Sequence, residues 1–251
     1  VLTVKDGANI TISGTTASAQ IVVDANAKAT ITLNGVNITA PAYENHITSE
    51  DLAQSALILS AGANLTLKLA ESSTNTLIGG AGVTSTGAPG IDVPSGGKLT
   101  IQGAGSLNVT GGASATSYGG AGIGGGYSQS GGDVIIEGGN VIATGGSNAA
   151  GIGGGALGDG GTTMIHGGTV TATGGKYAAG IGGGNSGAGG NITISGGNVT
   201  ATGGENAAGI GGGNSGTSGT FSTGESGNAV IMADSIQDKT YKSASTTSGV
   251  I

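Results

Sequence analysis

Acidic, aromatic and histidine side chains gather in one stretch of the chain, residues 40–55. The residues concerned are Tyr43, Glu44, His46, Glu50 and Asp51. Carboxylates and a histidine beside an aromatic ring could hold a sugar by hydrogen bonds and ring stacking, and carboxylate oxygens could hold a calcium ion. The alternative is that Ser49 caps a short helical turn, in which Glu50 and Asp51 favour the N-terminus and the other polar side chains are solvated.

Similar residues recur later in the chain, in segments that align with this stretch. They are Tyr118, Lys176, Tyr177 and Glu205. The segments shorten along the chain, from residues 40–55 through 79–90 and 111–120 to 145–148. Because function in a stacked repeat fold usually occupies long turns, we expect a ligand site on the edge that carries these tapering loops.

Threonines form a second candidate surface. We expect Thr110, Thr144, Thr173 and Thr202 to form one column, with Asn108, Ile142, Thr171 and Thr200 beside it. A flat array of this kind resembles the face used by some ice-binding proteins, and its candidate residues are Thr110, Thr144, Thr171, Thr173, Thr200 and Thr202. The alternative is structural, because threonine is a good exposed strand residue.

A regular repeat must position these residues. The sequence Gly-Ile-Gly-Gly-Gly begins at Gly122, Gly151, Gly180 and Gly209, so each copy starts 29 residues after the one before. Two further segments in each period alternate apolar and polar residues, as in residues 191–195 and 198–202, which is typical of half-buried strands. The 58 glycines leave few windows for a helix. Three strands per period predict an all-β fold, a three-sided parallel β-helix or β-solenoid.

The repeat extends in both directions. Its remaining strand recurs upstream at residues 21–23, 57–59 and 91–93, and we expect it to return at Val230-Ile231 after Ile210. This spacing predicts about eight rungs in a single domain that covers residues 1–251. Its expected parts are irregular coils at 1–120, regular glycine-rich repeats at 121–213 and a C-terminal irregular coil at 214–251.

The Gly-Ile-Gly-Gly-Gly segments are expected to place isoleucine in the core and bare backbone outside. Such a face could lie flush against another chain or a flat polymer. The alternative is that these glycines permit tight corners with positive φ and close packing. A phosphate loop is excluded, because no helix and no Lys-Ser or Lys-Thr pair follows the glycines.

Composition excludes several classes of partner. Only 8% of the residues are charged, the formal net charge is −7 and arginine is absent, which argues against nucleic acid and anionic membrane surfaces. No apolar run approaches 18 residues, so we expect no membrane insertion. The absence of cysteine excludes disulfides and thiolate metal sites.

Two kinds of segment carry a resemblance to known proteins. Ala29–Ile38 and Lys98–Gly111 resemble bacterial cell-surface proteins labelled as containing a carbohydrate-binding domain. The runs at 149–155 and 196–204 are similar to glycine-rich repeats in large surface adhesins of Gram-positive bacteria. The resemblance covers essentially the whole chain. It implies a right-handed parallel β-helix related to pectate lyases, exported and held at the bacterial cell surface.

These observations predict an extracellular adhesin module that binds polysaccharide or host glycan without catalysis. Since the chain begins at Val1 and stops in what resembles a further strand, we expect it to be a segment of a longer protein with neighbouring domains. The main alternative is a rigid structural spacer with no ligand of its own.

Catalysis and metal binding complete the set of alternatives. A polysaccharide lyase is disfavoured because the acids are dispersed: Asp133 and Glu137 align with Thr162 and His166 in the next copy. Calcium is the one cofactor considered. Asp159 lies in a calcium-repeat-like Gly-Asp-Gly-Gly segment but has no aspartate at matching positions, so Glu44, Glu50 and Asp51 are the stronger candidates.

Overall fold

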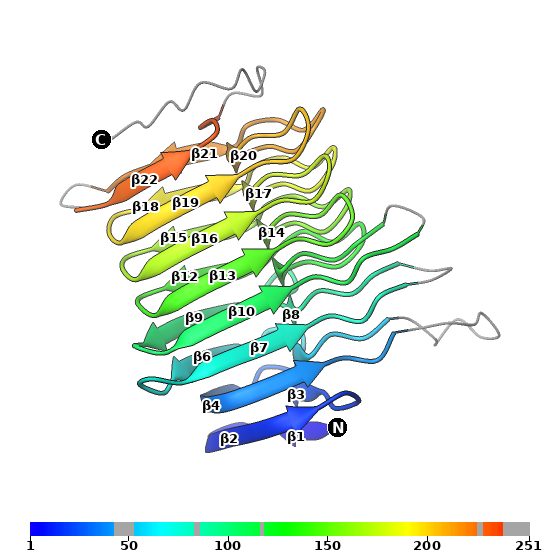
Figure 1. Ribbon diagram of the computed structural model, residues 1–251, viewed down its shortest axis with the longest axis vertical. Coiled ribbons are helices and arrows are strands. Elements are labelled where there is room, and N and C mark those ends of the chain that lie inside the picture. The colour runs from blue at the N-terminus through cyan, green and yellow to red at the C-terminus, as the bar shows by residue number, and fades with distance from the viewer. Residues whose placement is uncertain (43–52, 83–85, 116–117, 225–227, 238–251) are drawn as a thin grey trace.

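The computed structural model describes residues 1–42, 53–82, 86–115, 118–224 and 228–237. The chain folds into an all-β parallel solenoid, in which each coil stacks on the one before (Figure 1). The predicted fold class is confirmed. The described residues contain no helix that could cross a membrane.

The first face of the solenoid is an eight-stranded parallel sheet. Its strands are β1 (Leu2–Val4), β3 (Ile21–Val23), β5 (Leu57–Leu59), β8 (Ile91–Asp92), β11 (Ile123–Gly124), β14 (Ile152–Gly153), β17 (Ile181–Gly182) and β20 (Ile210–Gly211). The four Gly-Ile-Gly-Gly-Gly copies are in register, since Ile123 pairs with Ile152, and Ile181 with Ile152 and Ile210. The 29-residue coil is therefore confirmed.

The other two faces belong to one 14-stranded sheet. The second face contains β6 (Asn64–Leu69), β9 (Lys98–Gly103), β12 (Asp133–Ile136), β15 (Thr162–Ile165), β18 (Asn191–Ile194) and β21 (Thr220–Ser222). The third face contains β7 (Thr74–Ile78), β10 (Ser106–Thr110), β13 (Asn140–Thr144), β16 (Thr169–Thr173), β19 (Asn198–Thr202) and β22 (Val230–Ala233).

Two long strands join these faces at the N-terminal end. They are β2 (Asn9–Thr16) and β4 (Lys28–Thr39). The first half of β4 pairs with β6 and its last residues pair with β7, so one strand continues around the corner. Eight strands stack on the first face, but only about six turns have three separate strands. The predicted count of eight rungs therefore differs slightly from the structure.

The core consists of stacked aliphatic ladders. The inward residues of each strand are fully buried, as in Leu65, Leu99 and Val134, which occupy one column. Outward residues alternate with them along each strand. Each coil therefore buries its apolar side chains against equivalents one coil away, about 4.8 Å along the axis.

The C-terminal coil corrects one prediction. Val230 and Ile231 pair with Asn198 and Val199 of β19, so they belong to the third face. The sequence spacing predicts a position after Ile210 on the first face, but among the described residues Ile210 forms an isolated bridge with Ile236 there. The error arises because the regular period ends near residue 213.

The first face also corrects the expectation of bare exposed backbone. In the later coils the glycines of this face are buried, and Gly124, Gly153, Gly182 and Gly211 all have φ between +132° and +140°. A Cβ on Gly124 would lie 1.9 Å from the carbonyl oxygen of Gly153. The alternative interpretation, tight corners and close packing, is confirmed.

Candidate ligand-binding site

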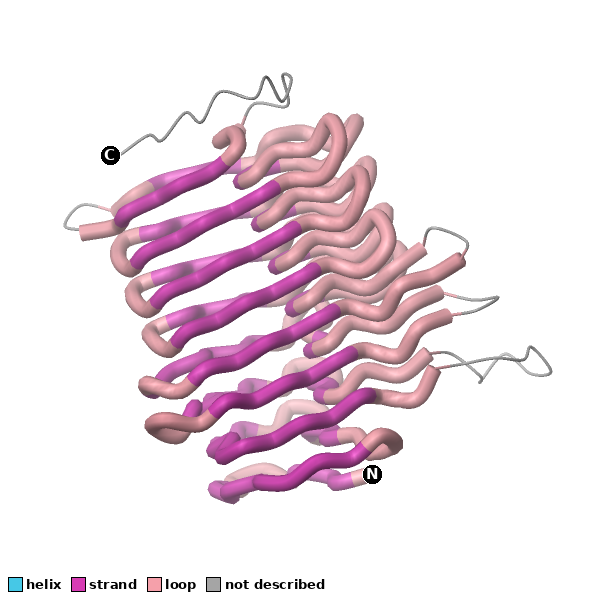
Figure 2. The backbone as a smooth tube through the Cα atoms, in the orientation of Figure 1, coloured by secondary structure: helices cyan, strands magenta, loops and turns pink. Residues whose placement is uncertain are grey.

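Loops from both sides of the first face cover its later coils. Ala150 N donates to Gly154 O across the face at 2.9 Å, and Asn185 N donates to Asn148 O of the preceding coil at 2.9 Å. Figure 2 shows these loops stacked beside one another along one edge. The strand glycines beneath them allow this close approach.

The turn that follows the first face changes length in the middle of the molecule. After β5 and β8 it is a tight turn, closed by hydrogen bonds from Ala63 N to Ser60 O and from Gly97 N to Pro94 O. After β11 it lengthens to residues 125–132. The longer loop extends beyond the short turns of the earlier coils, and a space remains beside the outward residues of β5 and β8.

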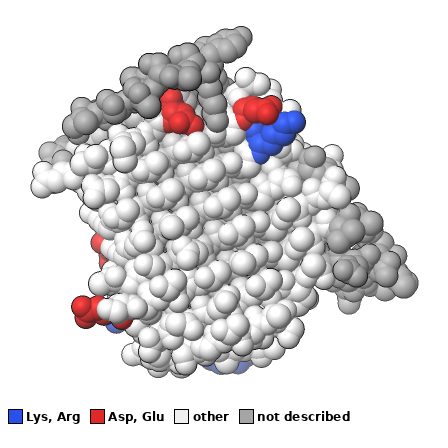
Figure 3. Space-filling model, viewed as in Figure 1, with Lys and Arg blue, Asp and Glu red and all other residues white. Residues whose placement is uncertain are grey.

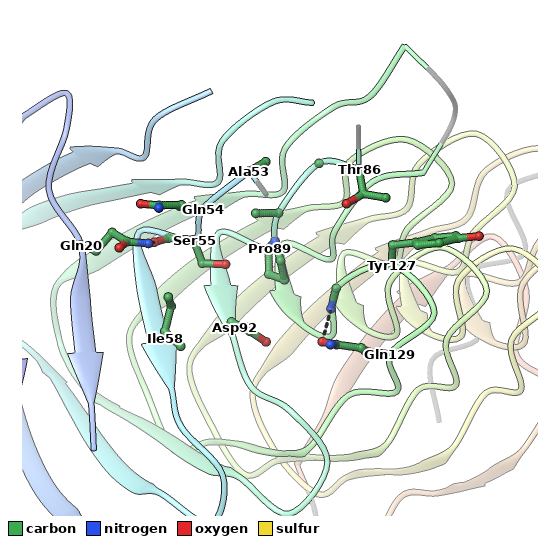
Figure 4. Close-up of a pocket in the computed structure, with 13 residues that line it drawn as sticks. Gln20, Ala53, Gln54, Ser55, Ile58, Thr86, Pro89, Asp92, Tyr127 and Gln129 are labelled. Atoms are coloured by element: carbon green, nitrogen blue, oxygen red, sulfur yellow. Dashed lines mark hydrogen bonds between the residues drawn. The ribbon is translucent and has the colours of Figure 1, made fainter. Parts of the chain in front are cut away.

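This space is a cavity of about 480 Å³. Ile58 and Asp92, which are partners in the β5–β8 register, contribute its strand residues. Its polar lining residues are Gln20, Gln54, Ser55, Thr86, Asp92, Tyr127 and Gln129 (Figure 4). Gln20 is held in place because its Nε2 donates to Ser55 O at 3.1 Å.

Asp92 is the charged residue of this lining. Its Oδ1 is buried and has no hydrogen-bond partner, and burial raises the pKa of Asp92 from 3.8 to about 6. Its carboxyl group and the amide of Gln129 point toward one another in Figure 4. Gln129 Oε1 accepts a hydrogen bond from Gly126 N at 3.4 Å, which orients the amide. A polar ligand group that entered the cavity would meet an uncompensated carboxyl group.

Two tyrosines lie together beside the loop that follows β11. Tyr127 lines the cavity, and its ring centroid lies 4.5 Å from that of Tyr118 with an interplanar angle of 41°. Tyr118 is 40% exposed. The predicted site residue Tyr118 therefore contacts a residue that lines the cavity, although Tyr118 is not one of the described lining residues itself.

Of the other predicted edge residues, some lie outside the described part of the chain and some lie on later coils, away from the cavity. Tyr43, Glu44, His46, Glu50 and Asp51 lie outside the described residues, and their proposed role stays a prediction. Lys176 lies over the ring of Tyr177, with 4.8 Å from its Nζ to the centroid. A side-chain hydrogen bond to Tyr177, and then the charge of Glu205, raise the pKa of Lys176. These three residues form a separate exposed group on later coils.

The predicted threonine columns are confirmed as geometry. Thr144 pairs with Thr110 and Thr173, and Thr200 pairs with Thr171 one coil below. The described strands of this third face carry no charged side chain, and Figure 3 shows its centre free of them. Ice binding by this face remains a prediction.

The dispersed acids form no visible cluster. In the described residues there is no group of three or more His, Asp or Glu side chains that could hold a metal ion. Asp159 Oδ1 accepts a hydrogen bond from Ala188 N at 2.7 Å, which gives this residue a structural role between coils. His166, which follows Glu137 one coil later, lies 2.7 Å from Ser195 Oγ through its Nδ1.

Comparison with known proteins supports the fold. A family model described as "Beta helix repeat" matches residues 134–156, 164–185 and 192–214. With the stacked parallel strands, this match supports a pectate-lyase-like parallel β-helix. No curated protein and no solved structure matched the chain.

Sequence reasoning did not select Asp92, Tyr127 or Gln129. One signal was present: the outward position on the first face is glycine in four successive coils but aspartate in the coil before them. A lone carboxylate that replaces a repeated glycine indicates that this coil has space outside its strand.

Proposed function

We propose that this protein is a non-catalytic module that binds polysaccharide or host glycan, with the cavity beside Asp92 as its binding site. The observation that carries the proposal is the cavity itself, which is lined by a carboxyl group, side-chain amides and a tyrosine. Sugars are bound by such combinations, because hydroxyl groups need hydrogen-bond partners and the ring faces are apolar.

The two tyrosines support a ligand longer than one sugar. Tyr127 would contact the unit in the cavity, and Tyr118, which is more exposed, would contact the next unit outside. This arrangement fits a chain that passes over the edge of the first face. The extracellular, cell-surface location remains part of the proposal, and it supplies the setting in which such polymers occur.

The proposal is tested by measuring binding to plant, bacterial and mucosal glycans, first with calcium and then with a chelator. Tyr127→Ala should weaken binding about ten-fold or more, because the ring contact is lost. Tyr177→Ala is the matched control, since it removes a tyrosine from the same edge but outside the cavity, and it should bind like the unmodified protein.

Three other outcomes would redirect the assignment. Loss of binding in Tyr177→Ala but not in Tyr127→Ala would move the site to the later turns. Binding that disappears with chelator would favour the carboxylates of residues 44–51. No binding under either condition would favour the rigid spacer.

A lyase is the remaining alternative. Asp92 could serve as a base, but a lyase also needs positive charge to stabilise the product of proton abstraction. The described residues that line the cavity provide no cationic side chain. Release of unsaturated uronides from pectin, measured by ultraviolet absorbance, would contradict the non-catalytic assignment.

A further inference from the structure

The charge of the cavity restricts its ligand, provided that the proposed function holds. Of the described residues that line the cavity, Asp92 alone carries a formal charge at neutral pH. No lysine in this lining can neutralise it. A carboxylate in such a position attracts a cation and repels an anion.

Within the described part of the chain, one oxygen of the Asp92 carboxyl group lacks a hydrogen-bond partner. The Oδ1 atom of Asp92 is buried without a hydrogen-bond partner, and burial raises the pKa of Asp92. Burial of a charge is costly unless a partner of opposite charge or a hydrogen-bond donor lies nearby. A ligand group that brings positive charge into the cavity lined by Asp92 would supply the missing opposite charge.

The other lining residues fit the remainder of a sugar. Gln54 and Gln129 offer amide donors and acceptors, and Tyr127 offers a ring. Tyrosine also favours a nearby cation on its ring face. Among common sugars, one with a free amino group combines hydroxyl groups, an apolar ring face and an ammonium group.

We propose that the cavity binds an amino sugar whose amino group is free and protonated, as in glucosamine polymers, with the ammonium group beside the Asp92 carboxylate. An N-acetylated unit would lose the positive charge. A uronic acid would place a second negative charge beside the first. The preferred polymer is therefore a de-N-acetylated amino-sugar chain.

The test uses calorimetry to compare oligomers of glucosamine, N-acetylglucosamine and glucose of equal length. The pH is about 6.5, which is above the pKa of Asp92, so that its carboxyl group is mostly ionised. We expect glucosamine oligomers to bind about ten-fold more tightly than the other two, and added salt to reduce the difference. Asp92→Asn should abolish the preference. Asp133→Asn, which removes an exposed carboxylate from the second face, controls for net charge and should retain it.

A lower pH gives an independent readout. At about pH 5, Asp92 would be mostly protonated while the amino group stays cationic, so the preference should disappear. Tyr127 is the other titratable group in the described lining of the cavity.

The outcomes separate this inference from the proposed function. Equal binding of all three oligomers would overturn the amino-sugar inference but leave glycan binding intact. The same would follow if Asp92→Asn kept the preference, provided that its circular dichroism spectrum matches the unmodified protein. No binding of any oligomer or glycan would overturn both.

Discussion

Asp92 occupies a position at which the later coils carry glycine. On the outer side of the first face, a cavity lies beside Asp92, whereas the later glycines are closely packed. Where the residue is Gly124, its φ is positive and a Cβ would collide with the backbone of Gly153 in the next coil. Where it is Asp92, the following turn is short and a side chain has room. The Asp92 side chain fits in this space, but its Oδ1 is buried there without a hydrogen-bond partner.

The altered pKa of Asp92 predicts a pH-dependent stability. Because the pKa is about 6 in the folded protein and 3.8 ordinarily, the folded state binds the proton more tightly. The free energy of unfolding should therefore fall as pH rises from about 4 to 6, by on the order of 3 kcal/mol, and stay low above that range. Asp92→Asn should remove this dependence, as measured by urea unfolding at pH values on both sides of the window.

Asp133→Asn provides the comparison, because it makes the same change in net charge at an exposed position. Parallel pH profiles for the unmodified protein and Asp92→Asn would contradict the assignment of this pH dependence to Asp92.

At the scale of elements, the strands could be predicted because their spacing is constant. The Gly-Ile-Gly-Gly-Gly copies fix the coil length, and alternation of residues such as Ile192 and Ile194 with Thr193 identifies the inward side. The continuation of β4 around a corner could not be predicted, because it follows from how one strand pairs with two others.

The cavity escaped prediction for a related reason. The cavity forms between a loop of one coil and the strands of the coils before it. Its lining residues therefore come from separate segments, and no single stretch of sequence predicts it. Tyr127 and Asp92 are 35 positions apart, and neither belongs to a repeated motif. Tyr118 was selected as an aromatic residue on a turn, and only the structure relates it to Tyr127.

Close loop packing predicts that the buried glycines tolerate no side chain. Gly184→Ala would bring its Cβ to 1.9 Å from the carbonyl oxygen of Gly155, although φ at Gly184 is not positive. The resulting overpacking should lower the free energy of unfolding by about 1 to 3 kcal/mol, measured by denaturant titration.

Gly126→Ala is the matched control. The nearest atom to its Cβ would be the flexible Gln129 Oε1 at 3.3 Å, which can move aside. We expect a change in unfolding free energy near zero. Equal destabilisation by the two substitutions would indicate that loss of glycine, and not contact with the neighbouring backbone, determines the effect.

At the scale of the whole molecule, each coil interacts mainly with its two neighbours. Removal of residues 152–180 would join Gly151 to Ile181 and preserve the local sequence at the junction. The β11 and β17 strands would then pair as β11 and β14 do now. We expect a folded protein with an unchanged β-type circular dichroism spectrum and a lower melting temperature, because fewer coil interfaces remain.

The same deletion should leave ligand affinity unchanged, because the cavity is formed by residues 20–129. An unfolded product would show that the coils are not interchangeable. A folded product with lost affinity would show that the later coils support the cavity from a distance.

Because the coil height is constant, the number of repeats determines a distance in the molecule. Each 29-residue copy beyond the cavity adds about 4.8 Å between the cavity and the C-terminal end of the solenoid. Duplication or loss of copies would change this distance in equal steps without altering the binding residues. The number of glycine-rich copies therefore sets the distance from the cavity to the C-terminal end of the solenoid, independently of the residues that line the cavity.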